Sequence, residues 1–237
     1  MKVNTLNFSK AGSPQEESED ALDFNMDELR FSICDGAGDS IFSAVWAQVL
    51  SSVYVSGNFD LTNDAELQDY INSCRLRWFE SIAWDSLKWN VKKKSVYGSY
   101  STFLSATLDK TSKKVTVWAR GDACFFLYDE DSMESFPITD PVMFGLHPEL
   151  VWSGYGNPIR DKKDYKFPEF KKNEFDFGDH KGILMATDAL SKYIMENGAS
   201  SVWEITDHYS NREFFDELRS NGKMRNDDVS AIIISSL

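Results

Sequence analysis

Acidic residues stand at the ends of several apolar segments in this sequence. Asp35 follows the apolar residues 30–34, and Asp188 follows residues 182–187. Asp227 comes just before the apolar run 229–234. A carboxylate at the edge of a hydrophobic strand is costly to bury unless a partner offsets its charge. Few basic residues stand beside these acids, so a shared divalent cation is the indicated partner, and hard oxygen ligands favour Mg²⁺ or Mn²⁺ over zinc.

Three further acids fit the same pattern. Asp122 follows Gly121 in a turn between two expected strands, and Glu19 and Asp20 open another strand candidate. Each acid alone has an ordinary explanation, because a turn Asp more often caps a helix or forms an Asx turn. Asp228, next to Asp227, fits a turn before a strand equally well. The spacing therefore leaves the metal site and the ordinary turns open as alternatives.

The elements that would position these acids can be read from the hydrophobic periodicity. Strands are expected over 2–8, 30–34, 99–109, 113–120, 123–129, 133–137, 182–187 and 229–234. Helices are expected over 64–90, 188–197, 200–208 and 211–221, and another follows a cap at Asp39 or Ser40. Residues 9–19 read as a loop, and 139–173 as an irregular, flap-like segment. Strands and helices that do not alternate regularly indicate an α+β fold. No boundary interrupts the chain, so a single domain over 1–237 is expected.

Composition excludes several classes of protein. The chain has 38 Asp and Glu against 25 Lys and Arg, a net charge of −13. This balance argues against nucleic acid and anionic membranes as partners. With 42% apolar residues the chain is too hydrophobic to be disordered. Cys34, Cys74 and Cys124 are isolated, which predicts buried free thiols rather than disulfides or a zinc site. A spanning segment and a signal peptide are not recognisable, so a cytoplasmic location is expected.

The motifs, taken in order, resemble those of the metal-dependent type 2C (PPM family) Ser/Thr protein phosphatases. The resemblance runs over almost the whole chain. It is closest to small bacterial members, whose Asp-Gly-Ala is followed by a Phe-Ser-x-x-Trp-Ala helix. The matching residues are Glu19-Asp20-Ala21, Asp35-Gly36, Phe42-Ser43-Ala44-Val45-Trp46-Ala47, Gly121-Asp122, Thr187-Asp188 and Asn226-Asp227-Asp228-Val229.

The resemblance implies a four-layer α-β-β-α sandwich, with two antiparallel sheets face to face and helices outside. It also implies a binuclear Mg²⁺ or Mn²⁺ centre, with a weaker third metal in some members. Asp35 would bridge the two metals, and the Gly36 carbonyl would bind one of them. The other implied ligands are Asp188 and Asp227, then Glu19 and Asp20 acting through water, and Asp122 for the third metal.

The implied reaction is hydrolysis of phosphoserine and phosphothreonine in a phosphoprotein substrate. Two cations about 3.5–4 Å apart lower the pKa of a water, and the resulting hydroxide attacks phosphorus in line. Asp35 and Asp20 would be the catalytic acids. The residues His147, His180 and His208 are dispersed, and we assign them ordinary surface or loop roles.

Some positions depart from the family pattern. Gln15 stands where many relatives have an Arg that holds the substrate phosphate, and a neutral amide cannot make that bidentate contact. Lys10 or Arg120 is then the candidate replacement cation. Other departures are Ala37, Cys124 and Lys192. The departures leave two alternatives open: a catalytically weak or inactive homologue that binds a phosphoprotein or partner, and a cation-binding or structural domain that shares only the fold. The sequence does not indicate the oligomeric state.

Overall fold

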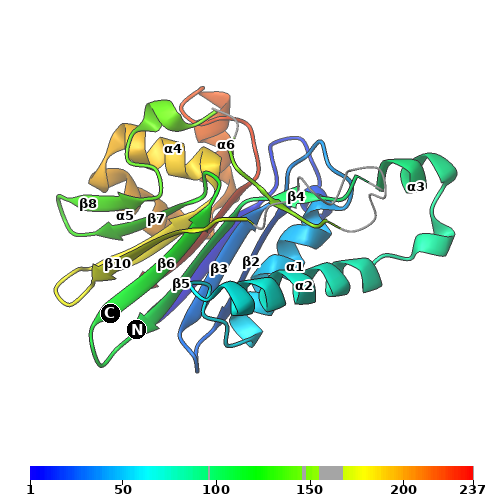
Figure 1. Ribbon diagram of the computed structural model, residues 1–237. Coiled ribbons are helices and arrows are strands. Elements are labelled where there is room, and N and C mark those ends of the chain that lie inside the picture. The colour runs from blue at the N-terminus through cyan, green and yellow to red at the C-terminus, as the bar shows by residue number, and fades with distance from the viewer. Residues whose placement is uncertain (96, 146–147, 155–167, 237) are drawn as a thin grey trace.

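Two antiparallel sheets form the centre of the molecule (Figure 1). A computed structural model describes residues 1–95, 97–145, 148–154 and 168–236. Over these residues each large sheet has five strands. The first sheet runs β1 (Lys2–Phe8), β12 (Val229–Ser235), β11 (Gly182–Ala186), β7 (Cys124–Tyr128) and β8 (Met133–Phe136). The second runs β10 (Lys171–Asp176), β6 (Lys114–Arg120), β5 (Phe103–Asp109), β3 (Arg30–Asp35) and β2 (Asp20–Asn25). The predicted α+β class is confirmed.

Two groups of helices cover the sheets. The helices α4 (Asp188–Asn197), α5 (Ala199–His208) and α6 (Arg212–Ser220) pack on the first sheet. The helices α1 (Ser43–Ser56) and α2 (Asp64–Glu80) pack on the second sheet. The short helix α3 (Trp89–Ser95) lies at the tip of an extension away from both sheets (Figure 1). Single 3₁₀ turns are η1 (Gln15–Glu17), η2 (Trp84–Ser86) and η3 (Pro141–Met143).

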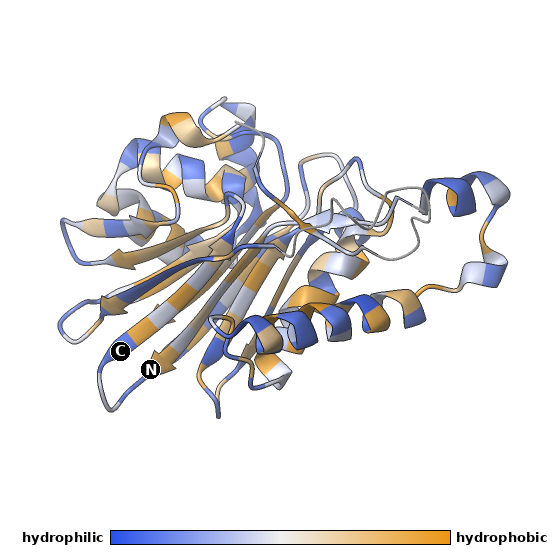
Figure 2. Ribbon diagram, in the orientation of Figure 1, coloured by the Kyte–Doolittle hydropathy of each residue, from blue (hydrophilic) through white to orange (hydrophobic). Residues whose placement is uncertain are grey.

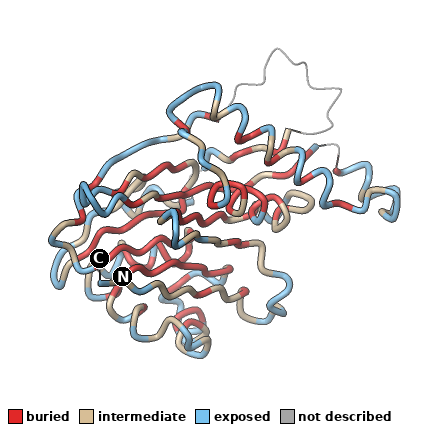
Figure 3. Tube along the Cα trace, turned by 90° about the horizontal axis from the view of Figure 1, so that it is seen from below, coloured by how far each residue is buried: buried red, intermediate tan, exposed pale blue. Residues whose placement is uncertain are grey.

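The core consists of three hydrophobic clusters that follow the alternation of the strands. Ile33 of β3 and Phe125 of β7 belong to the cluster formed by residues of both sheets. The neighbouring Cys34 and Phe126 point to the opposite faces, where the helices cover them. Both faces of the central strands are thus buried, which explains why these strands read as nearly continuous apolar runs (Figures 2 and 3).

Most of the predicted elements are confirmed to within one residue at each end. The predicted cap of the first helix is wrong: α1 begins at Ser43, after Phe42 with a left-handed φ of 61°. The Ser40 hydroxyl instead donates to the Ala37 carbonyl at 2.8 Å. Ser40 therefore closes the preceding turn and is not available to the helix.

The predicted helix over 64–90 is also wrong. The chain leaves the helix after Glu80, and η2 and α3 follow. The indole nitrogen of Trp84 donates to the Phe79 carbonyl at 2.7 Å, which folds the chain back on the end of α2. The buried residues Tyr70, Cys74 and Trp78 pack α2 onto the cluster that it shares with α1. Ile82, Trp84 and Leu87 still pack against this cluster, so the chain folds back over it instead of continuing as a helix.

The predicted strand 99–109 consists of two strands, β4 (Tyr100–Ser101) and β5, with Thr102 between them. In the flap-like segment 139–173, the described residues form η3, β9 (Val151–Trp152) and the start of β10. β9 pairs with β4 in a separate two-stranded sheet. Residues 146–147 and 155–167 of this segment lie outside the described residues.

The three cysteines are free and buried, as predicted. Cys34 and Cys74 lie in the cluster under α1 and α2, and Cys124 lies in the cluster under α4 to α6. Burial raises the pKa of each thiol. Within the described part of the chain, none of the helices has the length and apolar character needed to cross a membrane.

Candidate active site

Asp35 and Asp20 face each other at the end of the second sheet. They are directly paired across β2 and β3 in the antiparallel register. Asp20 is buried, and its Oδ2 accepts a hydrogen bond from the Thr187 hydroxyl at 2.9 Å. Thr187 directly follows the strand β11 of the other sheet and precedes α4. This bond therefore brings the acidic ends of the two sheets together.

The electrostatics show that the remaining strand-end acids belong to the same cluster. Burial raises the pKa of Asp35 well above its usual range, and the nearby charges of Asp20, Asp188, Asp122 and Asp227 raise it further. Burial, and then the charge of Asp188, raise the pKa of Asp122 to about 6. The five carboxylates come from five separate segments of the chain. We call these five residues the acidic cluster.

The backbone fixes the position of Asp35. Its N–H donates to the Thr102 hydroxyl and its carbonyl accepts from the Thr102 N–H, both at 2.8 Å. The break between β4 and β5 therefore frees Thr102 to hold the end of β3. The next residue, Gly36, has no room for a side chain, because a Cβ would lie 2.8 Å from the Glu19 carbonyl oxygen.

Glu19 and Asp228 tie the loop 9–19 to the site. The Ser43 hydroxyl, at the start of α1, donates to the Glu19 carboxylate. Asp228 is buried, and its two oxygens accept from the backbone N–H groups of Lys10 and Glu19, both at 2.8 Å. Asp228 thereby clamps both ends of the loop. This role of Asp228 was not foreseen from the sequence.

Arg225 lies between two of the predicted metal ligands. Its Nη2 is 2.6 Å from Asp227 Oδ2, and it also forms an ion pair with Asp188. Asp188 opens α4 with a side chain only 12% exposed, whereas the Asp227 side chain is 40% exposed. Arg225 was not among the site residues predicted from the sequence. Its closeness in sequence to Asp227 was the available signal, but its contact with Asp188 depends on the fold.

The chemistry of the acidic cluster suits a divalent cation. The cluster offers hard oxygen donors, and a dication would relieve the repulsion that raises the pKa values of Asp35 and Asp122. Over the residues that the structure describes, no group of three or more Asp, Glu, His or Cys side chains is already arranged to hold a metal ion. The donor types fit, and the positive charge between Asp188 and Asp227 belongs to Arg225.

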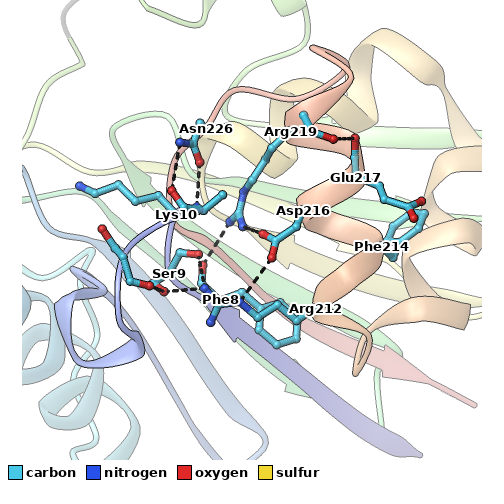
Figure 4. A network of polar contacts seen from close by, with 12 residues as sticks. Phe8, Ser9, Lys10, Arg212, Phe214, Asp216, Glu217, Arg219 and Asn226 are labelled. Carbon is cyan, nitrogen blue, oxygen red and sulfur yellow. Dashed lines mark hydrogen bonds and ion pairs between the residues drawn. The ribbon is translucent and has the colours of Figure 1, made fainter.

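The candidate substrate residues lie on the loop 9–19. Gln15 is exposed in η1; its amide nitrogen donates to Asn7 at 2.9 Å, and its oxygen accepts from Arg212 at 3.3 Å. The Lys10 side chain extends away from α6 (Figure 4). Arg120 donates to the carbonyls of Leu150 at 3.0 Å and Glu169 at 2.7 Å. Arg120 is therefore held by backbone groups, and Arg212 is the cation that contacts Gln15.

Arg219 anchors the loop that carries Asp227. Its side chain is 1% exposed and reaches from α6 to the Asp227 carbonyl at 2.7 Å and the Phe8 carbonyl at 3.3 Å (Figure 4). Asp216 pairs with it at 2.7 Å. Both the end of β1 and the Asp227 backbone are thus tied to α6.

The histidines lie in other contacts. His180 Nδ1 is 2.9 Å from Asp129, and His208 stacks on Phe214 with ring centroids 4.4 Å apart. His147 lies outside the described residues.

Solved structures of Ser/Thr phosphatases resemble this chain over nearly its whole length. Stp1 from Staphylococcus aureus matches with a TM-score of 0.66 at 14% identity, covering 100% of this chain and 95% of the other. The Mycobacterium tuberculosis serine/threonine phosphatase PstP/Ppp matches with a TM-score of 0.61 at 13% identity, covering 99% of this chain and 97% of the other. A bacterial serine phosphatase matches with a TM-score of 0.65 at 12% identity, covering 99% and 97%.

No family model and no curated protein sequence matches this chain. At 12–14% sequence identity, the structural similarity shows a shared fold. The chain therefore has the fold of the type 2C Ser/Thr phosphatases, and the resemblance inferred from its motifs is confirmed at that level.

Proposed function

We propose that this protein hydrolyses phosphoserine and phosphothreonine in proteins with the help of bound Mg²⁺ or Mn²⁺. The observation that carries the proposal is the acidic cluster of five carboxylates from distant segments, in which the charges of the other four raise the pKa of Asp35. The cluster lies in a chain whose fold is that of solved Ser/Thr phosphatases. Buried like charges are costly, so a role that uses them is the simplest account of their gathering.

The residues that would hold the cations are those of the acidic cluster and their neighbours. When bound, a pair of divalent cations would supply a water that is activated at neutral pH, and would neutralise the phosphoryl oxygens. A third cation at Asp122 is part of the proposal. The proposed ligand set is Asp35, Gly36, Asp188, Asp227, Glu19, Asp20 and Asp122.

The side chains of this chain would position these groups. Thr187 donates to Asp20 and fixes the direction of its carboxylate. Ser43 does the same for Glu19. Asp35 and Asp20 are the proposed catalytic acids, and Gln15 and Lys10 are proposed to face the substrate. Asp228 clamps the loop of these two residues, which would hold the proposed substrate side next to the acids.

The proposal includes the arrangement of the whole chain. We place residues 1–237 in one domain with the layer order helix, sheet, sheet, helix. The three hydrophobic clusters support this order, since one contains residues of both sheets and the others lie between a sheet and its helices.

A second candidate function is a weak or inactive homologue that binds a phosphoprotein. Two observations favour it. Arg225 is paired with Asp188 and Asp227, and Gln15 offers only a neutral amide on the substrate side. An inactive homologue would keep the fold and the loop without needing the cations.

Hydrolysis of a phosphopeptide separates the two candidates. The wild type, Asp35→Asn and Glu174→Gln would be assayed with Mn²⁺ and with a chelator. Glu174 is an exposed acid on β10 and serves as the control for a lost charge. The proposal predicts Mn²⁺-dependent turnover that Asp35→Asn abolishes and Glu174→Gln keeps. Phosphopeptide binding without turnover in all three proteins would favour the inactive homologue.

A further inference from the structure

We propose that Arg225 is a tethered cation that occupies the place of a metal between Asp188 and Asp227, and must leave before a divalent cation binds there. The inference rests on the metal centre of the proposed function. It means that a side chain of the protein itself competes with the metal for that centre. The protein would therefore need a higher concentration of metal than its donor set alone would require.

The geometry supports competition rather than a simple surface ion pair. One guanidinium nitrogen, Nη2, contacts both carboxylates, so the positive charge lies between them. The Asp188 side chain is only 12% exposed, and ion pairs with a partly buried partner are less screened than those on the surface. A cation held by Asp188 and Asp227 would have to displace the guanidinium charge that now lies between these two carboxylates.

Arg225 also has room to move away. Its side chain is 52% exposed, and it follows Gly222, which has a positive φ of 68°, in the turn before β12. Beside it lies a cavity of about 60 Å³ lined by Phe144, Gly145, Asp188, Ala189, Lys192 and Arg225. Release of the guanidinium therefore does not require the core to rearrange.

The size of the competition depends on the fraction of molecules in which Arg225 is paired. A ligand that binds only the open state has its apparent affinity reduced by the fraction of molecules that are open. If Arg225 is paired in about nine molecules out of ten, the apparent Kd for metal is about tenfold higher than the intrinsic one.

The test is calorimetric titration of Mn²⁺ into the chelator-stripped full chain. Arg225→Gln is expected to lower the Kd for Mn²⁺ about tenfold. Lys192→Gln removes a positive charge bordering the same cavity, where Lys192 pairs with Glu196 at 3.7 Å. Its Kd is expected to stay within about twofold of the wild type, because Lys192 does not hold the two carboxylates. If both variants gain equally in affinity for Mn²⁺, the effect comes from net charge alone, and the proposal is overturned.

A melting curve in chelator distinguishes competition from a purely structural role. Loss of Arg225 should lower the melting temperature without metal, and added Mn²⁺ should raise it more than in the wild type. A lower melting temperature with unchanged or weaker Mn²⁺ affinity would overturn the proposal. If Arg225→Gln does not fold without metal, Arg225→Lys, which keeps the charge but loses the planar donors, is expected to give a smaller gain in affinity.

The titration also separates this inference from the proposed function. If the wild type and Arg225→Gln bind Mn²⁺ with the same affinity, the competition is refuted while the metal centre stands. If neither binds Mn²⁺, both are refuted. If only Arg225→Gln binds, the competition holds and the wild type behaves as the inactive homologue.

Discussion

Asp35 is held firmly by its backbone, although its surroundings disfavour its ionised form. Both its N–H and its carbonyl are held by Thr102, while the charges of four other carboxylates raise the pKa of its side chain. Such a setting costs stability in the protein without metal, since burial and like charges both disfavour the ionised acid. A residue placed at this cost is expected to matter for activity more than for folding.

Asp35→Asn tests that expectation, because it removes the charge and nearly keeps the shape. We expect Mn²⁺-dependent hydrolysis to be lost and the metal-free protein to melt about 2–4 °C higher, which corresponds to roughly 1 kcal/mol of relieved repulsion. A phosphopeptide assay and a thermal melt in chelator measure the two effects. Turnover at the wild-type rate in saturating Mn²⁺ would show that Asp35 does not hold the metals.

Gln15→Arg tests the substrate side of the loop. A guanidinium would give the substrate phosphate a charged donor, and a hydrogen bond to a charged group contributes roughly 1.5–3 kcal/mol. We expect kcat/KM to rise about tenfold or more, mainly through KM. Ser13→Arg brings the same charge into the same loop and should leave kcat/KM nearly unchanged. Equal behaviour of both variants would exclude position 15 as a phosphate contact.

Single residues were predictable where the motif itself carried the role. The acids of the cluster could be named because each one ends an apolar segment. The roles of Arg225 and Asp228 could not be, since the Arg225 to Asp188 pair spans 37 residues and the Asp228 to Lys10 bond spans 218. Contacts over such distances depend on how the sheets pack, which local spacing does not encode.

At the scale of elements, the strands were predictable and the ends of the helices were not. Strands buried on both faces leave long apolar runs in the sequence. The start of α1 depends instead on Phe42 in a left-handed conformation and on Ser40 bonding to Ala37. The packing of the turn after Asp35 determines both features. The usual preference for capping residues therefore predicts the wrong start for α1.

The helix α6 is expected to position the Asp227 loop through Arg219. Arg219→Leu keeps the apolar bulk but leaves the Asp227 and Phe8 carbonyls without their buried donor. An acceptor left without its buried donor costs about 1–3 kcal/mol, and two carbonyls lose theirs, so the melting temperature should fall by roughly 6 °C. Mn²⁺ affinity should fall as well.

Arg212→Leu is the matched control on the same helix. Arg212 also pairs with Asp216, but its side chain is 36% exposed. Its loss should lower the melting temperature much less, because exposed ion pairs contribute about 0–1 kcal/mol. Equal losses in the two variants would mean that the buried anchor contributes no more than the surface pair.

At the scale of the whole molecule, the acidic cluster should make stability depend on pH. The folded protein holds a proton on Asp122 up to about pH 6, whereas the unfolded chain loses it near the usual value of about 3.9. The contribution of Asp122 to unfolding free energy therefore falls as pH rises through this window, by about 3 kcal/mol in total.

Thermal melts in chelator, compared with Asp122→Asn, measure this contribution. The free energy of unfolding of the variant should rise relative to that of the wild type between pH 4 and 6.5. At neutral pH the variant should be the more stable protein. Mn²⁺ should reduce the difference by offsetting the charges of the cluster. A difference that is constant over this range would contradict the raised pKa of Asp122.

The alkylation rates of the three buried thiols would report how often each side of the molecule opens. Since a thiolate is needed for alkylation, Cys34, Cys74 and Cys124 should react only after local opening. Alkylation of Cys124 would report the release of α4 to α6 from the first sheet. Alkylation of Cys74 would report the release of α2 from the second sheet. Mass spectrometry of alkylated peptides would thus show whether Mn²⁺ slows opening on both sides together or only on the side that carries Asp188.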